Sequence, residues 1–345
     1  MGSAERKRAP RRPVAVAHLV ERLTLFHSSK VKKTPGRFSP IVSRALGFNQ
    51  SPYYDRDCRL ADCPSSYWGI DRCLRINETV DPFHSRIFYG GAFSCSVDSK
   101  PPAPAPLLDI RFAELQRAVF VQFFSLLDWL GVPRNILEAT YFGGAELGGP
   151  GDGRDGGLTR RRSFPRDDVS AQTLRQFSIR ATSVPTISHM AFGSFDGALV
   201  GPRVDIYCRG VELAALVFNC YRFRRGILQP TNYVGGYTIG MERLLCALSH
   251  SDFLSAVPRY RRARRLIERQ SKAARSPGME RDVMEVLFGV EVIAHLPKRL
   301  SRANERLVQR MKSRIKPSIH NLGLSFDHIT KIYQHFQNAR ASKSI

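Results

Sequence analysis

Three arginines lie in local patterns that could bind the phosphates and the base of a nucleotide. Arg72 and Arg75 flank Cys73-Leu74 in an apolar segment typical of a β-strand. Their offset of three is odd, so a regular pleat would direct only one of them to a pocket face. An arginine beside the α-phosphate of ATP stabilises the negative charge that develops when a carboxylate is activated. One of this pair could therefore supply the phosphate contact of an adenylate-forming site.

Glycines precede the third arginine. Gly235, Gly236 and Gly240 would let a ligand approach the backbone closely, and Arg243 lies one turn into the helix expected to follow. Carboxylate activation also needs a flat or cationic group that holds adenine, which Arg243 could provide. A simpler interpretation stays open for each pattern taken singly. An isolated arginine is more often a surface residue or an ion-pair partner, and a glycine-rich turn is usually only a turn.

A second cluster of arginines lies farther along the chain. The segment 259–265 contains Arg259, Arg261, Arg262, Arg264 and Arg265 around one tyrosine. Such a segment can bind phosphates and stack a nucleic-acid base. A solvated helical face explains the same pattern equally well.

The composition indicates a folded protein with a polyanionic partner. The chain has 345 residues, of which 43% are apolar, so one large domain or two ordinary ones can bury a core. Its 53 Lys and Arg residues against 30 Asp and Glu give a net charge of +23. Such an excess attracts phosphates and favours nucleic acid. A basic surface that is merely solvated is the alternative.

The sequence shows no signal for a membrane or for secretion. No apolar run reaches the roughly 18 residues that span a bilayer, and no apolar signal core follows the basic N-terminus, so we expect a cytoplasmic protein. The seven cysteines are scattered and odd in number, which is typical of reduced core thiols. Cys58 and Cys63 lack a matching second pair, so we expect no zinc site there.

Both strands and helices are expected in the first 250 residues, and these elements must position the candidate residues. We expect a disordered basic tail at 1–13 and then a helix to residue 26. A strand hairpin with a long loop should occupy 67–95, and Gly131 should end an amphipathic helix capped by Asp109. Further predicted elements are a strand at 137–142, a flexible glycine-rich loop at 143–168, strands near 204–207 and 213–223, and a helix from Met241.

Only helices are expected after residue 250. We therefore predict an α+β catalytic domain at 14–250 and a basic helical module at 251–345.

Several short motifs in the same order resemble the catalytic core of alanyl-tRNA synthetases, which are class II aminoacyl-tRNA synthetases. Asp71-Arg72-Cys73-Leu74-Arg75 looks like their motif 2, Gln-Arg-Cys-Val-Arg, and Gly240-Met241-Glu242-Arg243-Leu244 resembles motif 3, Gly-Leu-Glu-Arg-Leu. Between them, 201–206 is similar to Gly-Pro-Cys-Ser-Glu-Ile and 212–218 to Glu-Ile-Trp-Asn-Leu-Val-Phe. The likeness covers about residues 70–248, and it implies an antiparallel class II sheet flanked by helices.

The resemblance implies roles for the matching residues. Arg75 corresponds to the arginine on the ATP α-phosphate, and Arg243 to the arginine that stacks on adenine, which suits a planar guanidinium. Asp205 and Glu212 correspond to acidic positions near ATP and its magnesium. The implied ATP contacts are Arg72, Arg75, Asp205, Glu212, Gly240 and Arg243.

The amino-acid half of the site departs from the family. The aspartate that holds the substrate ammonium is replaced by Gly236, or by Thr238 if the gap falls differently, and the family asparagine is Ala215. Phe192 falls where the family has a pocket tryptophan, and Asp196 belongs to the same expected pocket. Without a paired carboxylate a buried ammonium is costly. A substrate other than alanine, or an acid without that ammonium, therefore fits better.

Three functions follow from these patterns. The first is ATP-dependent formation of an aminoacyl adenylate and its transfer to tRNA, with ATP, Mg²⁺, an amino acid and tRNA as ligands. The second keeps the adenylation but uses a non-tRNA acceptor in a biosynthetic pathway. The third is a catalytically inactive paralogue that binds RNA. Class II cores often pair, so a homodimer stays open, although the sequence shows no convincing motif 1 helix.

Overall fold

Among the residues that the structure describes, ten strands lie before residue 241. The computed structural model describes residues 22–23, 25–26, 66–74, 87–96, 105–147, 162–186, 189–190, 199–225, 227–249, 251–295 and 302–341. The strands are β1 (Ser66–Leu74), β2 (Ile87–Ser96), β3 (Leu137–Phe142), β4 (Ala145–Leu147), β5 (Arg162–Phe164), β6 (Arg180–Val184), β7 (Leu199–Val200), β8 (Arg203–Cys208), β9 (Val211–Arg224) and β10 (Ile227–Gly240).

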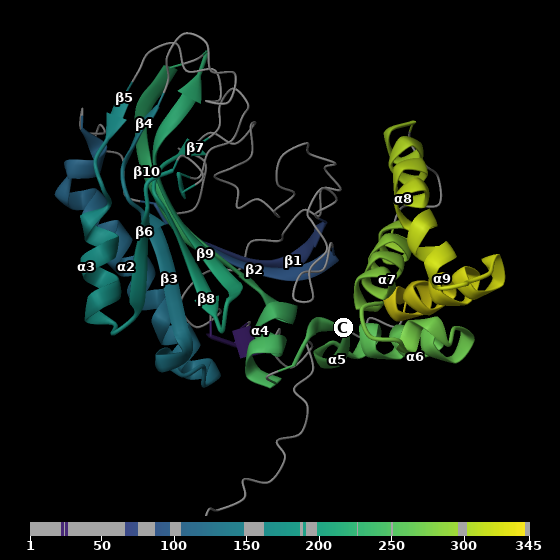
Figure 1. The fold of residues 1–345 in the computed structure, drawn as a ribbon. Helices are drawn as coiled ribbons and strands as arrows, with labels where there is room; N and C mark the ends of the chain where they lie inside the picture. Colours follow the sequence, from purple (N-terminus) through teal and green to yellow (C-terminus); the bar gives the residue numbers. More distant parts are fainter. Residues whose placement is uncertain are drawn as a thin grey trace, which may run out of the picture.

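Helices lie beside the sheet and follow it in the chain. They are α2 (Ile110–Leu130), α3 (Asp168–Gln176), α4 (Met241–Ser249), α5 (Phe253–Ala256), α6 (Pro258–Gln270), α7 (Glu280–His295), α8 (Arg302–Asn321) and α9 (Phe326–Ala341). Figure 1 shows α2 and α3 on one side of the sheet, and α5 to α9 gathered beyond α4. Among the helices that the structure describes, none is long and apolar enough to traverse a lipid bilayer.

The main sheet is largely antiparallel. Its strand order is β1-β2-β10-β9-β8-β3-β6, with β7 paired to β9, and among the described strands only β3 and β6 pair in parallel. The predicted hairpin is confirmed, because β1 and β2 pair antiparallel from Ser66↔Cys95 to Leu74↔Ile87. The hairpin adjoins β10, which leads directly into α4. The expected α+β class, an antiparallel sheet flanked by helices and followed by helices only, is confirmed.

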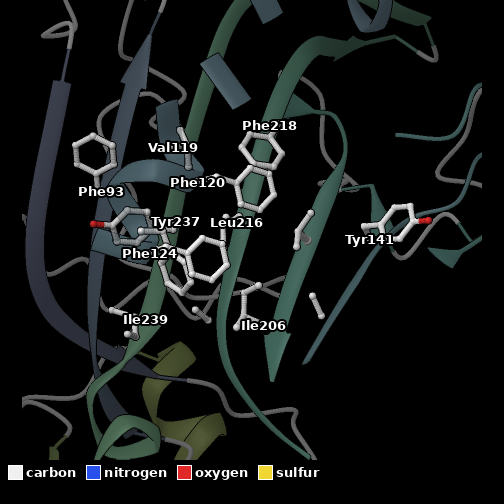
Figure 2. Close-up of a cluster of buried hydrophobic side chains, with 14 of the residues drawn as sticks. Phe93, Val119, Phe120, Phe124, Tyr141, Ile206, Leu216, Phe218, Tyr237 and Ile239 are labelled. Atoms are coloured by element: carbon white, nitrogen blue, oxygen red, sulfur yellow. The ribbon is translucent and has the colours of Figure 1, made fainter. Parts of the chain in front are cut away.

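Helix α2 forms the centre of the core. Asp109 caps it by accepting a hydrogen bond from the backbone of Arg111, and Gly131 ends it in the left-handed conformation, as predicted. Figure 2 shows aromatic rings of α2 against rings of the sheet. Phe120 lies 5.5 Å from Phe218, between ring centroids. The residues of α2 that belong to this core cluster are Phe112, Leu115, Val119, Phe120, Phe123, Phe124, Leu126, Leu127 and Leu130.

A second core lies among the C-terminal helices. Tyr260 and Phe288 pack edge to face at 5.1 Å between ring centroids, and Phe336 of α9 lies 5.8 Å from Tyr260. This cluster contains residues from α4 to α9 and is distinct from the cluster around α2. The predicted boundary near residue 250 therefore falls close to a change of core, although the division into domains stays a prediction.

Some elements were not predicted. Helix α3 and strand β6 lie in a stretch without a clear apolar period, and β10 contains Pro230 and two adjacent glycines that are unusual in a strand. The two described ends of the predicted 143–168 loop form a short ribbon, β4 paired with β5, while its centre lies outside the described residues. The tail at 1–13 also lies outside them.

Candidate active site

Three of the residues expected near the ligand, one each on β8, β9 and β10, lie in one row across the sheet. Thr238 of β10 pairs in register with Ala215 of β9, and Ala215 pairs with Asp205 of β8. Thr140 of β3 continues the row beyond Asp205. Residues directly opposite each other in paired strands carry side chains on the same face. Thr238, Ala215, Asp205 and Thr140 therefore form a continuous line of small or polar groups.

This row lies on the face away from α2. The next row along the same four strands is apolar and buried: Ile239, Ala214, Ile206 and Ala139. Gly235 shares a face with Ile239, and a Cβ added to it would lie 3.0 Å from Val119 and 3.1 Å from Leu115 of α2. Because side chains alternate along a strand, Gly236 shares the face of Thr238. We call the face of Gly236, Thr238, Ala215, Asp205 and Thr140 the polar face.

Two arginines and two carboxylates are linked where β8, β9 and α4 meet. Arg243 Nη1 lies 3.3 Å from Glu212 Oε2 and donates a hydrogen bond of 3.0 Å to the Glu212 carbonyl. Glu212 Oε1 lies 3.5 Å from Arg203 Nη2, and Arg203 Nε lies 2.5 Å from Asp205 Oδ1. Positive and negative groups therefore alternate from α4 to the centre of the polar face.

The junction of β10 and α4 positions Arg243. A Cβ added to Gly240 would lie 3.2 Å from Arg243 Cδ, so glycine lets the arginine pack closely against the end of the strand. Only 6% of the Arg243 side chain is exposed. The preceding residue, Glu242, is fully buried and lies 2.9 Å from Arg259 Nη2. Ion pairs to both β9 and α6 thus fix the first turn of α4.

His189 extends the network beside Asp205. Its Nε2 lies 2.8 Å from Thr140 Oγ1 and 3.6 Å from Asp205 Oδ2. Burial lowers the pKa of His189, although the charge of Asp205 opposes this. Burial also raises the pKa of Asp205, and Arg203 opposes that rise. The cation that pairs with Asp205 at 2.5 Å is Arg203.

Part of the site expected from the sequence lies outside the described residues. Arg72 is within β1, paired in register with Tyr89 of β2. Arg75, Phe192 and Asp196 lie outside the described residues. The convergence of Arg75 and Arg243 on one nucleotide therefore stays a prediction.

The arginines of 259–265 separate into two groups. Arg259 is paired with Glu242 and with Glu291 of α7, both at 2.9 Å, and 12% of its side chain is exposed. Its guanidinium is therefore held by two carboxylates inside the protein, and a contact of this residue with nucleic acid stays a prediction. Tyr260 is fully buried, so it is a core residue and not a platform for a base.

The other arginines of α6 are accessible. Arg261, Arg262 and Arg265 are exposed, while Arg264 is partly exposed and lies 2.6 Å from Glu268 one turn later. A pair of this kind on a helix surface is weak, so it does not commit Arg264 to a structural role. These four residues remain candidates for phosphate contacts.

Sequence reasoning missed Arg203 and His189. Arg203 lies two positions before Asp205 on β8, and this spacing could have indicated that both side chains are on one face of the strand. His189 belongs to none of the named strands and helices, and it contacts Thr140, which lies 49 residues away in the chain. No local pattern could have identified His189.

The described residues do not fit the magnesium that the resemblance implies. Mg²⁺ is bound by oxygen ligands in octahedral geometry, usually carboxylates, substrate phosphates and water. Asp205 and Glu212 supply carboxylates, but Arg203 contacts both of them. Across the part of the chain that the structure describes, no group of three or more His, Cys, Asp or Glu residues could hold a metal ion. The oxygens of Asp205 and Glu212 already bind a cation, which is the guanidinium of Arg203.

Comparison with known proteins gives distant matches to synthetases. No protein-family model and no curated protein matches the chain. A pyrrolysyl-tRNA synthetase from Desulfitobacterium hafniense is 14% identical over 58% of this chain and 47% of that one, with a TM-score of 0.25. The asparaginyl-tRNA synthetase of Entamoeba histolytica in complex with asparaginyl-adenylate is 11% identical over 70% and 65%, with a TM-score of 0.36.

The aspartyl-tRNA synthetase from the same organism is 11% identical over 70% of this chain and 57% of that one, with a TM-score of 0.37. The chain thus spans about half to two thirds of the length of these synthetases. Likeness this distant assigns neither an activity nor a substrate.

Proposed function

We propose that the chain is a class II aminoacyl-tRNA synthetase-like ligase that activates an amino acid with ATP and transfers it to tRNA. A carboxylate oxygen of the acid attacks the α-phosphorus, the bond to the β-phosphate breaks, and pyrophosphate leaves. Negative charge builds on the α-phosphate oxygens, and a fixed guanidinium stabilises it. Arg75 has this role in the proposal, and Arg243 contacts the adenine.

The observation that carries the proposal is the arrangement of the two arginine-bearing segments. The β1–β2 hairpin pairs directly with β10, through Ser94↔Gly236 and Ala92↔Thr238. Strand β10 ends at Gly240, and α4 then presents Arg243 next to Glu212. Because only 6% of Arg243 is exposed, stacking on adenine requires the side chains over it to move when the nucleotide binds.

The small residues of the polar face support a substrate other than alanine. Ala215, Gly236 and Thr238 carry no carboxylate at the positions where an α-ammonium would need one. The nearest acidic group in the row is Asp205, which is already paired with Arg203. This favours a second candidate function, in which the adenylated substrate is an acid without an α-ammonium and the acceptor is not tRNA.

Exposed arginines on α6 support RNA as the acceptor. Arg261, Arg262 and Arg265 lie on the accessible side of this helix. Each phosphate contact releases a counterion, so removing one arginine should reduce the salt slope of RNA binding by about 1. Arg262→Ala should therefore weaken tRNA binding and leave adenylation unchanged.

The test is ATP–pyrophosphate exchange with a panel of amino acids and of carboxylic acids that lack an α-ammonium. We expect exchange with at least one acid, and Arg75→Ala should lower it about 100-fold or more, the typical cost of losing a charge-stabilising donor. Arg243→Lys should weaken ATP binding, because an ammonium is a poor stacking partner for adenine. Arg262→Ala is the matched control that should exchange normally.

The outcomes separate the candidates. If an amino acid supports exchange and the addition of tRNA then consumes the activated amino acid, the tRNA ligase function is supported. Exchange only with acids that lack the ammonium, and insensitive to tRNA, supports the second function. No exchange with any acid and no ATP binding by equilibrium dialysis would reject adenylation and leave an inactive RNA-binding paralogue.

A further inference from the structure

Arg203, at the centre of the site, differs from the residue found in the family that the segment resembles. The segment 201–206 reads Gly-Pro-Arg-Val-Asp-Ile, where the family it resembles has Gly-Pro-Cys-Ser-Glu-Ile. A neutral residue is thus replaced by a cation two positions before Asp205. On strand β8 this spacing directs both side chains to the polar face.

The guanidinium of Arg203 lies between the two carboxylates of the site. Its Nε is 2.5 Å from Asp205 Oδ1, and its Nη2 is 3.5 Å from Glu212 Oε1. Asp205 is 7% exposed and Glu212 20%, so both contacts are largely shielded from water. Shielding strengthens charge interactions relative to those at the surface. Arg203 itself is 26% exposed, so a ligand phosphate could reach it.

The charges of the cluster balance without a metal ion. Arg203 and Arg243 are matched by Asp205 and Glu212 through the ion pairs of the network. A divalent ion between the carboxylates would have to displace Arg203, because cations of the same sign repel at this range. It would also leave a partly buried guanidinium without its carboxylates, which is costly.

We propose that Arg203 is the resident cation of this site, occupying the position that a divalent metal ion between Asp205 and Glu212 would need. It holds the two carboxylates in place and excludes the metal from between them. The inference rests on the proposed function only in assigning the site to a nucleotide. If a nucleotide binds there, any divalent ion that accompanies its phosphates is not bridged by this carboxylate pair.

The test measures Mn²⁺ binding by the free-ion electron paramagnetic resonance signal, on the full chain without ATP or amino acid. Asp205→Asn serves as the blank, so that binding elsewhere on the chain is subtracted. The wild type should bind no Mn²⁺ that depends on Asp205. Arg203→Met keeps the length of the side chain and removes its charge, and it should bind Mn²⁺ at least tenfold more tightly. Adding Asp205→Asn to it should abolish that gain.

Two further variants serve as controls. Arg203→Lys keeps the charge and should exclude Mn²⁺ as the wild type does. Arg180→Met removes an arginine that pairs with Glu138 at the exposed edge of the sheet, and it should change nothing. Circular dichroism checks the fold of each variant.

Wild-type Mn²⁺ binding that Asp205→Asn abolishes would overturn the proposal, and so would a folded Arg203→Met that gains no binding. If Arg203→Met does not fold, equal binding by the wild type and Asp205→Asn supports the proposal. Since no nucleotide is present, a failure of pyrophosphate exchange leaves this result intact, and a failed metal prediction leaves the adenylation proposal standing.

Discussion

Replacing Arg259 by methionine should destabilise the protein far more than replacing any exposed arginine of the same helix. The guanidinium lies 2.9 Å from both Glu242 and Glu291, whose side chains are 0% and 1% exposed. Burial opposes ionisation of Arg259, but the charges of Glu291 and Glu242 raise its pKa above the usual value. Removing one partner from a buried ion pair typically costs about 3–5 kcal/mol, because the remaining charge stays buried.

We expect the cost of Arg259→Met to reach the upper part of that range. One substitution takes the same cation from two buried carboxylates, and these belong to α4 and α7. An exposed arginine such as Arg262 should change the free energy of unfolding by no more than about 0.5 kcal/mol. The contrast between the two residues, three positions apart on α6, is the quantity to measure.

Urea unfolding followed by far-UV circular dichroism measures this difference, with Arg262→Met as the matched control. A third variant, Glu242→Gln with Glu291→Gln and Arg259→Met, removes all three charges and should recover most of the loss, because no uncompensated charge remains. A loss below about 1 kcal/mol for Arg259→Met would refute the reasoning. So would a triple variant no more stable than Arg259→Met alone.

Three further predictions concern the fold around the site. Asp109→Ala removes the side-chain cap of α2 and the acceptor of the Tyr233 hydroxyl, and it should cost at least about 1 kcal/mol in thermal unfolding; an unchanged midpoint would contradict the cap. Gly235→Val places extra carbons against Val119 and should lower the free energy of unfolding, measured with urea, by about 1–3 kcal/mol. An unchanged free energy of unfolding would mean that α2 moves aside without cost. Burial raises the pKa of Cys246 to about 12, so peptide mapping after iodoacetamide treatment at pH 8 should find this thiol unmodified until the protein is unfolded.

Elements whose signals are local could be predicted from the sequence. Helix α2 carries an apolar stripe, a capping aspartate and a terminal glycine within one segment, and strand β3 at Leu137–Phe142 coincides with the predicted strand. Periodicity and capping depend on neighbours in the chain, so they need no knowledge of the rest of the fold. Mixed strands and helices in the first 250 residues, followed by helices only, were enough to predict the α+β class.

The polar face was only partly foreseeable. Asp205, Ala215 and Thr238 were selected by resemblance, but their alignment in one row depends on the register of β8, β9 and β10. A shift of one residue in any pair would turn a side chain to the opposite face. The parallel strand β6 and the contact of His189 with Thr140 depend on the same long-range pairing.

The environment of each arginine depends on long-range folding. Arg259 and Arg262 lie in the same basic stretch, yet one is held by two buried glutamates and the other is exposed. Arg203 was not singled out from the sequence, yet it joins the two carboxylates of the site. A guanidinium has the same chemistry in every local pattern. Its role is set by which carboxylates and how much water the folded chain brings to it, and those partners come from distant segments.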